Sequence, residues 1–300
     1  MKRSPESSAL ILLHVIVFIF GFTGILGKLI STDADVLVWW RMLIAAVAIG
    51  VFSYATGKIV KPLSTHALRY ALVGLIIAAH WILFFHAIKI STVSVTLACL
   101  SASSLYTALL EPLFFHRRID PFELVFGVMV VAGLFLIFSF ETEYTMGIVV
   151  ALVSAFFSSL FTVLNGVFIK QDNPYRISLV EMIAGVVGIS VWLMFTGKFG
   201  ANLWQSVPSE DWLWIVILGV VATAFAFVGN IKVMEHVTPY TVSLSINLEP
   251  VYGIVLAYFI FGDEERMSVG FYVGACIIVL ALYLNTMLKR GKIRFTRMWR

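Results

Sequence analysis

Long apolar stretches, separated by short polar breaks, run along almost the whole chain of 300 residues. A transmembrane helix needs about 20 mostly apolar residues, and ten stretches meet that requirement. They cover residues 9–29, 35–56, 69–89, 92–116, 121–140, 147–169, 176–196, 211–233, 238–261 and 268–288. Strands of a membrane β-barrel would alternate apolar and polar residues, which these stretches do not. The pattern predicts an all-α integral membrane protein with ten transmembrane helices.

Composition agrees with a location in the bilayer. Hydrophobic residues make up 60% of the chain and charged residues 13%, whereas soluble proteins carry about 25% charged residues. The formal net charge of +4 is compatible with nucleic-acid binding, but the positions of the charges follow the loops between the apolar stretches. We therefore expect the positively charged residues to contact the lipid bilayer, and we expect no nucleic acid as a partner.

The lysine and arginine residues predict the orientation, because the cytoplasmic loops of membrane proteins are enriched in them. With a cytoplasmic N-terminus, the cytoplasmic side holds Lys2, Arg3, Lys58, Lys61, Arg69, Arg117, Arg118, Lys170, Arg176, Lys232, Lys289, Arg290, Lys292, Arg294, Arg297 and Arg300. The outside then holds only Lys28, Lys89, Lys198 and Arg266, while Arg41 lies within a helix. We predict a multi-pass protein of the cell membrane with both termini in the cytoplasm.

The second half of the chain is an altered copy of the first. Placing Tyr106 on Tyr252 aligns two apolar runs around a turn, which is basic at Arg117-Arg118 and acidic at Asp263-Glu264. Each half holds an odd number of helices, five, so the second copy must cross the membrane in the opposite sense. Inverted repeats of this kind are typical of secondary transporters, which hold the substrate near the midplane. The predicted units are a first five-helix repeat (1–143), a second, inverted repeat (144–288) and a basic cytoplasmic tail (289–300).

Polar residues near the middle of the predicted ninth helix mark the strongest candidate site. A charged side chain at the centre of a transmembrane helix costs about 2.5–3.5 kcal/mol, so Glu249 needs a compensating interaction. Pro250 has no backbone N–H and frees a carbonyl one turn earlier, beside Asn247. These features favour a polar pocket for a substrate or a proton. A structural hydrogen bond from Glu249 and a simple kink at Pro250 are the alternatives.

Other polar and aromatic residues extend this candidate cavity. His80 has a side chain that titrates near neutral pH, and Trp81 can stack on a substrate, although ordinary packing explains either residue. For hydroxyl residues in membrane helices, close helix packing is the ordinary explanation. For Arg41, the alternative to a site role is a side chain that snorkels to the membrane surface. The candidate substrate-binding residues are Glu249, Asn247, His80, Trp81, Tyr106, Tyr252, Ser104, Asn165, Asn230 and Arg41. The candidate proton-coupling residues are Glu249, His80 and Glu111.

The C-terminal segment LEPVYGIVLAYFIFGDEERMSVGFYVGACIIVLALYL resembles EamA-type members of the drug/metabolite transporter superfamily. The segment FGFTGILGKLI and the position of Arg41 after Trp39-Trp40 also fit that family. Glu111-Pro112 departs from the pattern, because it lies about two turns later in the repeat than Glu249-Pro250 does. The resemblance implies ten helices, a central cavity between the repeats, and metabolite transport, commonly export.

The leading hypothesis is a secondary transporter, most simply an exporter, of small organic metabolites, with amino-acid-like solutes favoured by the resemblance. A flippase for a lipid-linked substrate is the alternative. The ATP-binding pattern G-x-x-x-x-G-K-[ST] is absent, which leaves the substrate gradient or protons as the source of energy. The patterns H-E-x-x-H and G-x-S-x-G are also absent, so an intramembrane enzyme is less well supported. We expect no catalytic residues, cofactor or metal; the oligomeric state stays open and is compatible with a monomer.

Overall fold

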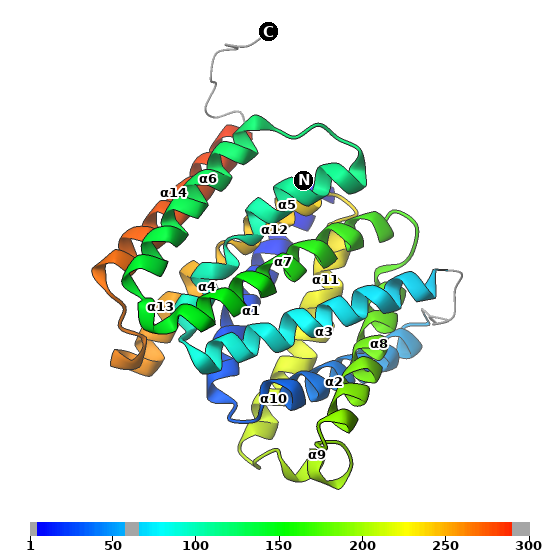
Figure 1. Ribbon diagram of the computed structural model, residues 1–300. Helices are drawn as coiled ribbons and strands as arrows, with labels where there is room; N and C mark the ends of the chain where they lie inside the picture. The colour runs from blue at the N-terminus through cyan, green and yellow to red at the C-terminus, as the bar shows by residue number, and fades with distance from the viewer. Residues whose placement is uncertain (1–4, 58–65, 290–300) are drawn as a thin grey trace.

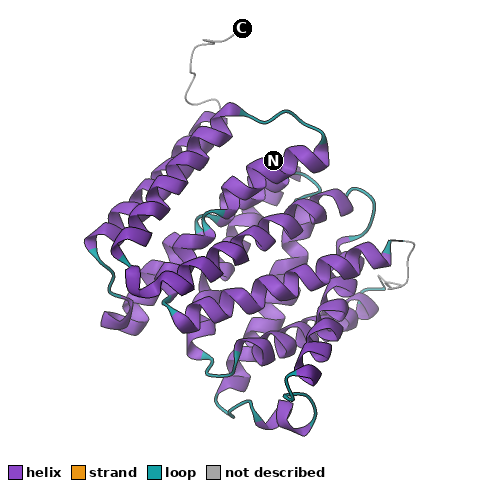
Figure 2. Cartoon of the chain, viewed as in Figure 1, coloured by secondary structure: helices purple, strands orange, loops and turns teal. Residues whose placement is uncertain are grey.

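The computed structural model describes residues 5–57 and 66–289, and every regular element within them is a helix (Figure 2). The first half contains α1 (Pro5–Leu29), α2 (Ala34–Ala55), α3 (Ala67–Ile90), α4 (Val93–Leu100), α5 (Ser103–Phe115) and α6 (Pro121–Phe140). The second half contains η1 (Thr142–Tyr144), α7 (Thr145–Phe168), α8 (Pro174–Phe195), α9 (Ala201–Gln205), α10 (Asp211–Gly219), η2 (Val220–Phe225), α11 (Ala226–Val233), α12 (Pro239–Ile246), α13 (Glu249–Phe261), η3 (Gly262–Glu265) and α14 (Val269–Lys289).

The ten predicted membrane-spanning helices are confirmed. In the described part of the chain, 9 helical segments are long and apolar enough to cross a membrane. The tenth is α14, a helix of 21 residues whose described apolar part is Val269–Ala281. Much of the evidence for orientation lies outside the described residues, namely Lys2, Arg3, Lys58, Lys61 and the tail beyond Lys289.

Two of the predicted helices are broken near the middle of the membrane. The apolar run 92–116 forms α4 and α5, which separate at Ser101-Ala102, and the run 238–261 forms α12 and α13, which separate at Asn247-Leu248. The run 211–233 stays continuous but contains η2, a π-helical segment between α10 and α11. Irregularities of this type are frequent at functional sites.

The broken helices confirm the register of the inverted repeat. The alignment that places Tyr106 on Tyr252 also places both ends of α4 on those of α12, and both ends of α5 on those of α13. It sets the N-cap residue Thr92 on the N-cap residue Thr238. In both copies the threonine side chain accepts a hydrogen bond from the backbone N–H three residues later. The two copies therefore fold alike, and their boundary near residue 143 stays a prediction.

Packing between the halves follows the same symmetry (Figure 1). Helix α3 packs against α7 and α8, while the segment formed by α10, η2 and α11 packs against α1 and α2. Exchanging the two repeats converts the first set of contacts into the second. Helix α4 meets α13, and α5 meets α12, so the two broken helices cross each other. At one edge α6 lies along α14.

Glycine residues allow the closest helix contacts, as expected where lipid supplies no hydrophobic drive between helices. A Cβ atom on Gly133 of α6 would lie 2.7 Å from the carbonyl oxygen of Gly274 on α14, and one on Gly274 would lie 2.5 Å from the carbonyl oxygen of Gly133. The two backbones therefore touch, and neither position has room for a side chain.

We predict that Gly133→Ala lowers stability by about 1–3 kcal/mol, because overpacking forces the two backbones apart. Thermal unfolding of the purified protein in detergent measures this change. Gly50→Ala is the matched control, since a Cβ atom there meets nothing within 4 Å. Equal melting temperatures for the two variants would contradict the tight contact between α6 and α14.

Candidate functional site

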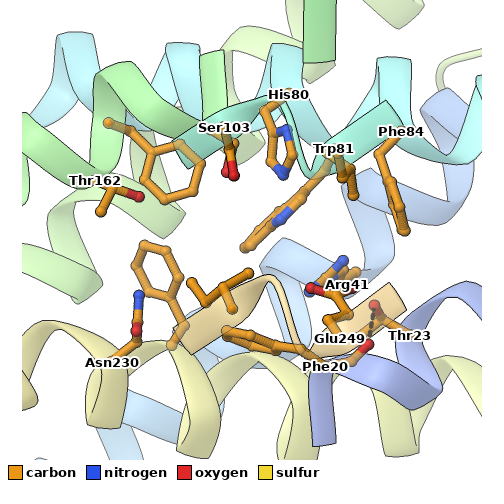
Figure 3. Close-up of a pocket in the computed structure, with 15 residues that line it drawn as sticks. Phe20, Thr23, Arg41, His80, Trp81, Phe84, Ser103, Thr162, Asn230 and Glu249 are labelled. Atoms are coloured by element: carbon orange, nitrogen blue, oxygen red, sulfur yellow. Dashed lines mark hydrogen bonds between the residues drawn. The ribbon is translucent and has the colours of Figure 1, made fainter. Parts of the chain in front are cut away.

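A cavity of about 70 Å³ lies between the two repeats (Figure 3). From the first repeat, α1 to α5 border it, and from the second, α7, α11, α12 and α13 do so. The lining residues that the sequence analysis singled out are Arg41, His80, Trp81, Asn230 and Glu249. The cavity therefore collects residues that are distant in sequence into one polar and aromatic site.

The cavity lies on the pseudo-twofold axis that relates the repeats. Trp81 and Phe227 occupy equivalent positions in the register, and their rings meet edge to face with centroids 5.7 Å apart. Ser103 and Glu249 are also equivalent, as the first residues of α5 and α13, and both line the cavity. Equivalent positions of the two repeats therefore meet at this site.

Arg41 points into the cavity rather than to the surface. It is only 2% exposed, and its Nε donates a hydrogen bond of 2.6 Å to the hydroxyl oxygen of Thr223. Its guanidinium carbon lies 3.9 Å from the centroid of a Trp81 ring, a distance at which a cation is attracted to the aromatic face. Thr223 belongs to the π-helical segment η2, so this irregularity helps to hold the arginine.

Glu249 is the first residue of α13 and is buried. The start of a helix carries a partial positive charge that favours a carboxylate. The side chains of Glu249 and Arg41 lie near each other in the cavity, and their charges interact. Among the described residues, however, no ion pair within 4.0 Å joins them. Each charge is therefore held in place without being fully compensated by the other.

His80 connects α3 to α7 at the edge of the cavity. Its Nδ1 lies 2.9 Å from the carbonyl oxygen of Ser154 and 2.8 Å from the Ser154 hydroxyl oxygen. The Ser154 hydroxyl in turn donates to the carbonyl oxygen of His80. These contacts are those of a histidine that stabilises helix packing, although its ring also borders the cavity.

The other predicted site residues lie outside this cavity in the described structure. Tyr252 is 36% exposed and its ring meets that of Phe18, and Tyr106 packs on Phe156. The Ser104 hydroxyl donates to a backbone carbonyl of the preceding turn. Asn165 and Asn247 are buried, at 1% and 2% exposure, and neither lines the cavity.

Several lining residues were missed by the sequence analysis. Thr23 and Phe20 come from α1, and Thr162 comes from α7. Ser103 was the easiest to find, because it is the counterpart of Glu249 in the repeat register. The predicted residue, Ser104, is its neighbour and the counterpart of Pro250 in the same register.

Two buried carboxylates cap the N-termini of the broken helices, at opposite ends of the bundle. Glu265, from η3, accepts hydrogen bonds from the backbone N–H groups of Val93 and Ser94 at the start of α4, at 3.0 and 2.9 Å. It also accepts from the Ser94 hydroxyl and pairs with Lys28 at 2.9 Å. A carboxylate of the second repeat therefore caps a helix of the first.

At the other end the roles are reversed. Glu111, near the end of α5, accepts a hydrogen bond of 2.7 Å from the backbone N–H of Tyr240 at the start of α12. Arg117 pairs with Glu111 at 3.2 Å and with Glu123 at 2.8 Å. Partial burial opposes the charge of Arg117, but these two carboxylates raise its pKa overall. Glu111 thus joins the repeats at one end of the bundle, away from the central cavity.

Comparisons with known proteins agree with this architecture. Residues 7–139 and 145–287 each match the model of the EamA-like transporter family. The uncharacterized transporter YxxF of Bacillus subtilis (strain 168) is 22% identical over 99% of this chain and 95% of its own length. An uncharacterized transporter of Archaeoglobus fulgidus is 27% identical over 45% of this chain and 47% of its own length.

A solved structure described as "Crystal structure of protein" shares the fold, with a TM-score of 0.72, 17% identity and coverage of 96% of this chain and 99% of that one. The family match covers both repeats and nearly all of the described helices. The chain is a multi-pass membrane transporter that belongs to the EamA-like transporter family.

Proposed function

We propose that this chain is a secondary transporter of small organic metabolites, with zwitterionic, amino-acid-like solutes as its substrate class. The observation that carries the proposal is the central cavity, in which Arg41 and Glu249 lie near each other without an ion pair. A solute with a carboxylate and an ammonium group would compensate both charges at once. Burying either charge without compensation is costly in a membrane, so such a solute gains binding energy from both ends.

The aromatic lining favours a solute that also carries an apolar group. Rings of Trp81, Phe84, Phe161 and Phe227 border the cavity. They supply apolar contact area together with faces that attract cations. The guanidinium of Arg41 lies over a Trp81 ring, so a substrate carboxylate would approach the side of the arginine that the ring leaves free. This arrangement supports amphipathic rather than strongly polar solutes.

The small size of the cavity supports transport by alternating access. Its volume of about 70 Å³ is well below the roughly 300–1,000 Å³ of typical ligand pockets. We infer that the described conformation is occluded and that the repeats move apart to admit a substrate. The caps formed by Glu265 and Glu111 join the repeats at opposite ends. Breaking one cap while keeping the other would open one side at a time, as inverted repeats allow.

Energy for transport would come from the substrate gradient or from protons. Glu249 and His80 border the cavity and stay candidates for a proton that moves with the substrate. Glu111 caps α12 at one end of the bundle, so any proton that it binds would act on the opening of that end.

A lipid-like substrate is the second candidate, because of an apolar groove on the outside of the bundle. The groove has a volume of about 480 Å³ and lies between α13 and α14. Pro250 and Tyr283 are among its lining residues, so it runs beside the break in the ninth helix. A groove of this shape would suit an acyl chain. The charged central cavity favours the zwitterionic solute as the first candidate.

We further propose that the protein lies in the cell membrane, exports its substrate and keeps both termini in the cytoplasm. The excess of lysine and arginine in the loops assigned to the cytoplasm supports this orientation. In that orientation the Glu265 cap faces the outside and the Glu111 cap faces the cytoplasm.

We predict that Glu249→Gln lowers the uptake of zwitterionic amino acids into proteoliposomes by at least about tenfold, because a hydrogen bond to a charged group contributes about 1.5–3 kcal/mol. Uptake of the corresponding N-acetyl amino acids, which have no ammonium group, should not respond to the substitution. Glu264→Gln is the control, since that side chain is 74% exposed and lies outside the cavity. Repeating the assay with an imposed pH gradient tests whether Glu249 also carries the coupling proton.

Equal uptake of amino acids and their N-acetyl derivatives by the unmodified protein would contradict recognition of a zwitterion. If no metabolite moves under any imposed gradient while fluorescent lipids are exchanged between leaflets, the lipid-like substrate is correct instead.

We predict that Glu265→Ala lowers stability by about 3 kcal/mol, because it leaves buried N–H groups of α4 without an acceptor. Glu264→Ala is a closely matched control: Glu264 also pairs with Lys28, at 3.2 Å, but it is exposed. Exposed ion pairs contribute less than about 1 kcal/mol. Thermal unfolding in detergent separates the two, and a similar small effect of both variants would argue against the cap as a link between the repeats.

The charge bias places both termini in the cytoplasm. We therefore predict that a reporter protein that is fluorescent only in the cytoplasm gives full signal when it is fused to the C-terminus. A reporter that is active only outside the cytoplasm gives the reciprocal control. The opposite pattern of signals would reverse the assignment of the two caps to the two sides.

A further inference from the structure

A further buried carboxyl group, apart from the central cavity and from the two helix caps, is that of Glu181. Glu181 is the eighth residue of α8 (Pro174–Phe195) and its exposure is 0%. It does not line the central cavity. Such a residue in a membrane protein is functional more often than not, because of what its burial costs.

The surroundings of Glu181 offer it no completed hydrogen bond. Among the described residues, neither carboxyl oxygen of Glu181 has a hydrogen-bond partner. The side-chain amide of Asn165, on α7, lies next to the carboxyl group, and its nitrogen and oxygen are also without partners. The Ser178 hydroxyl, three residues before Glu181 on α8, is in the same condition. Buried polar atoms of Glu181, Asn165 and Ser178 are therefore left without hydrogen bonds on α7 and α8.

Charged groups on the neighbouring helices are engaged elsewhere. Tyr70 of α3 donates a hydrogen bond to Asp172, and Asp172 pairs with Arg176 at 2.8 Å. Lys170 donates to the carbonyl oxygen at the end of α11, and Lys232 of α11 is exposed.

The remaining charged and titratable groups on α2 are also occupied or distant. Arg41 binds Thr223, Asp35 pairs with Lys198, and Tyr54 is exposed. Helix α7 carries no titratable residue in its sequence. Among the described residues, no ion pair within 4.0 Å joins Glu181 to a cation. Arg176, on the same helix, has an unpartnered Nε but pairs with Asp172 through another nitrogen.

Glu181 and Arg41 occupy equivalent positions in the two repeats. Helices α2 and α8 both have 22 residues, and Arg41 is the eighth residue of α2 as Glu181 is of α8. The same scaffold position therefore holds a buried base in one repeat and a buried acid in the other. The base is held by Thr223 and Trp81, whereas the acid has an amide beside it and no counter-charge.

We propose that Glu181 is a proton-binding site, separate from the substrate cavity, that holds its proton in the described conformation and releases it when α3 and α8 move apart. A neutral carboxyl group avoids most of the cost of burying a charge. With a proton present, the acid O–H can donate to the Asn165 carbonyl oxygen, and the Asn165 N–H can donate to the acid carbonyl oxygen. These two bonds use all four unpartnered atoms of the two side chains, whereas an ionised carboxylate could make only one of them.

The contact between α3 and α8 gives the proton a link to conformational change. Gly74 of α3 lies directly against the backbone of Glu181, so closely that a methyl group there would collide with the Glu181 carbonyl oxygen. The two helices belong to different repeats and pack along each other. If the repeats rock apart at the cytoplasmic end, water reaches Glu181 and takes the proton. This coupling step rests on the alternating access proposed above, whereas the bound proton itself does not.

Infrared difference spectroscopy of the purified full-length protein at neutral pH tests the bound proton, since a protonated carboxyl group has a C=O stretching band that a carboxylate lacks. We expect Glu181→Gln, which keeps the shape and the neutral state, to unfold at the same temperature and to lack one such band. Asn165→Ala should move that band to the frequency of an acid without a hydrogen-bond partner. Asn230→Ala is the matched control, an identical change at a buried amide of the central cavity, and should leave the band in place.

Retention of every carboxyl band in Glu181→Gln would overturn the proposal, because Glu181 would then be ionised. Loss of the band when sodium replaces choline in the buffer would also overturn it, and would assign the oxygen atoms to a sodium ion. Gly74→Ala tests the coupling: it should weaken the Glu181 band at the same pH, whereas Gly50→Ala should not, and equal bands would remove the link to helix separation. None of these measurements needs a substrate, so a failed transport assay and a failed proton site are distinguishable.

Discussion

The bilayer provides no water to satisfy backbone N–H groups, and this constraint controls where the chain can interrupt a helix. Helices α4 and α12 both start with a threonine N-cap, but that cap leaves neighbouring N–H groups without an acceptor. Glu265 and Glu111 supply the missing acceptors from the opposite repeat. The starts of α4 and α12, at opposite ends of the bundle, are therefore fully capped only when the two repeats are assembled.

Because the repeats are inverted, equivalent positions in them share the same fold but can carry opposite charges. Equivalent turns face opposite sides of the membrane, so one is basic at Arg117-Arg118 and the other acidic at Asp263-Glu264. The same exchange occurs inside the membrane, where Arg41 corresponds to Glu181. A twofold scaffold thereby produces a cavity with one basic side and no matching basic group opposite. A substrate with two different ends can bind such a cavity in only one direction.

Hydropathy was sufficient to predict the helices, because spanning segments must be apolar over their whole length. The repeat register was also predictable, and Tyr106 on Tyr252 placed the ends of the broken helices correctly. The caps at the starts of α4 and α12 could not be read from the sequence, since each depends on a carboxylate far along the chain. For the same reason the sequence could not show which of the predicted site residues share one cavity. Glu249 and Arg41 line the cavity, whereas Tyr252 faces outward because its side chain lies on another side of the helix.

In the proposed mechanism, Glu249 and Glu181 would divide the work that a proton-coupled transporter requires. Glu249 lies beside a fixed positive charge in the cavity, so its charge responds to what occupies the cavity. Glu181 lies at the contact between α3 and α8, so in the same proposal its charge would respond to how the repeats are arranged. Under this proposal, separate positions would let substrate and proton act on one conformational equilibrium without competing for one group. A substrate or a proton can shift that equilibrium only by the difference in its affinity for the two conformations. A carboxyl group that moves from a dry helix contact into water would provide such a difference in proton affinity.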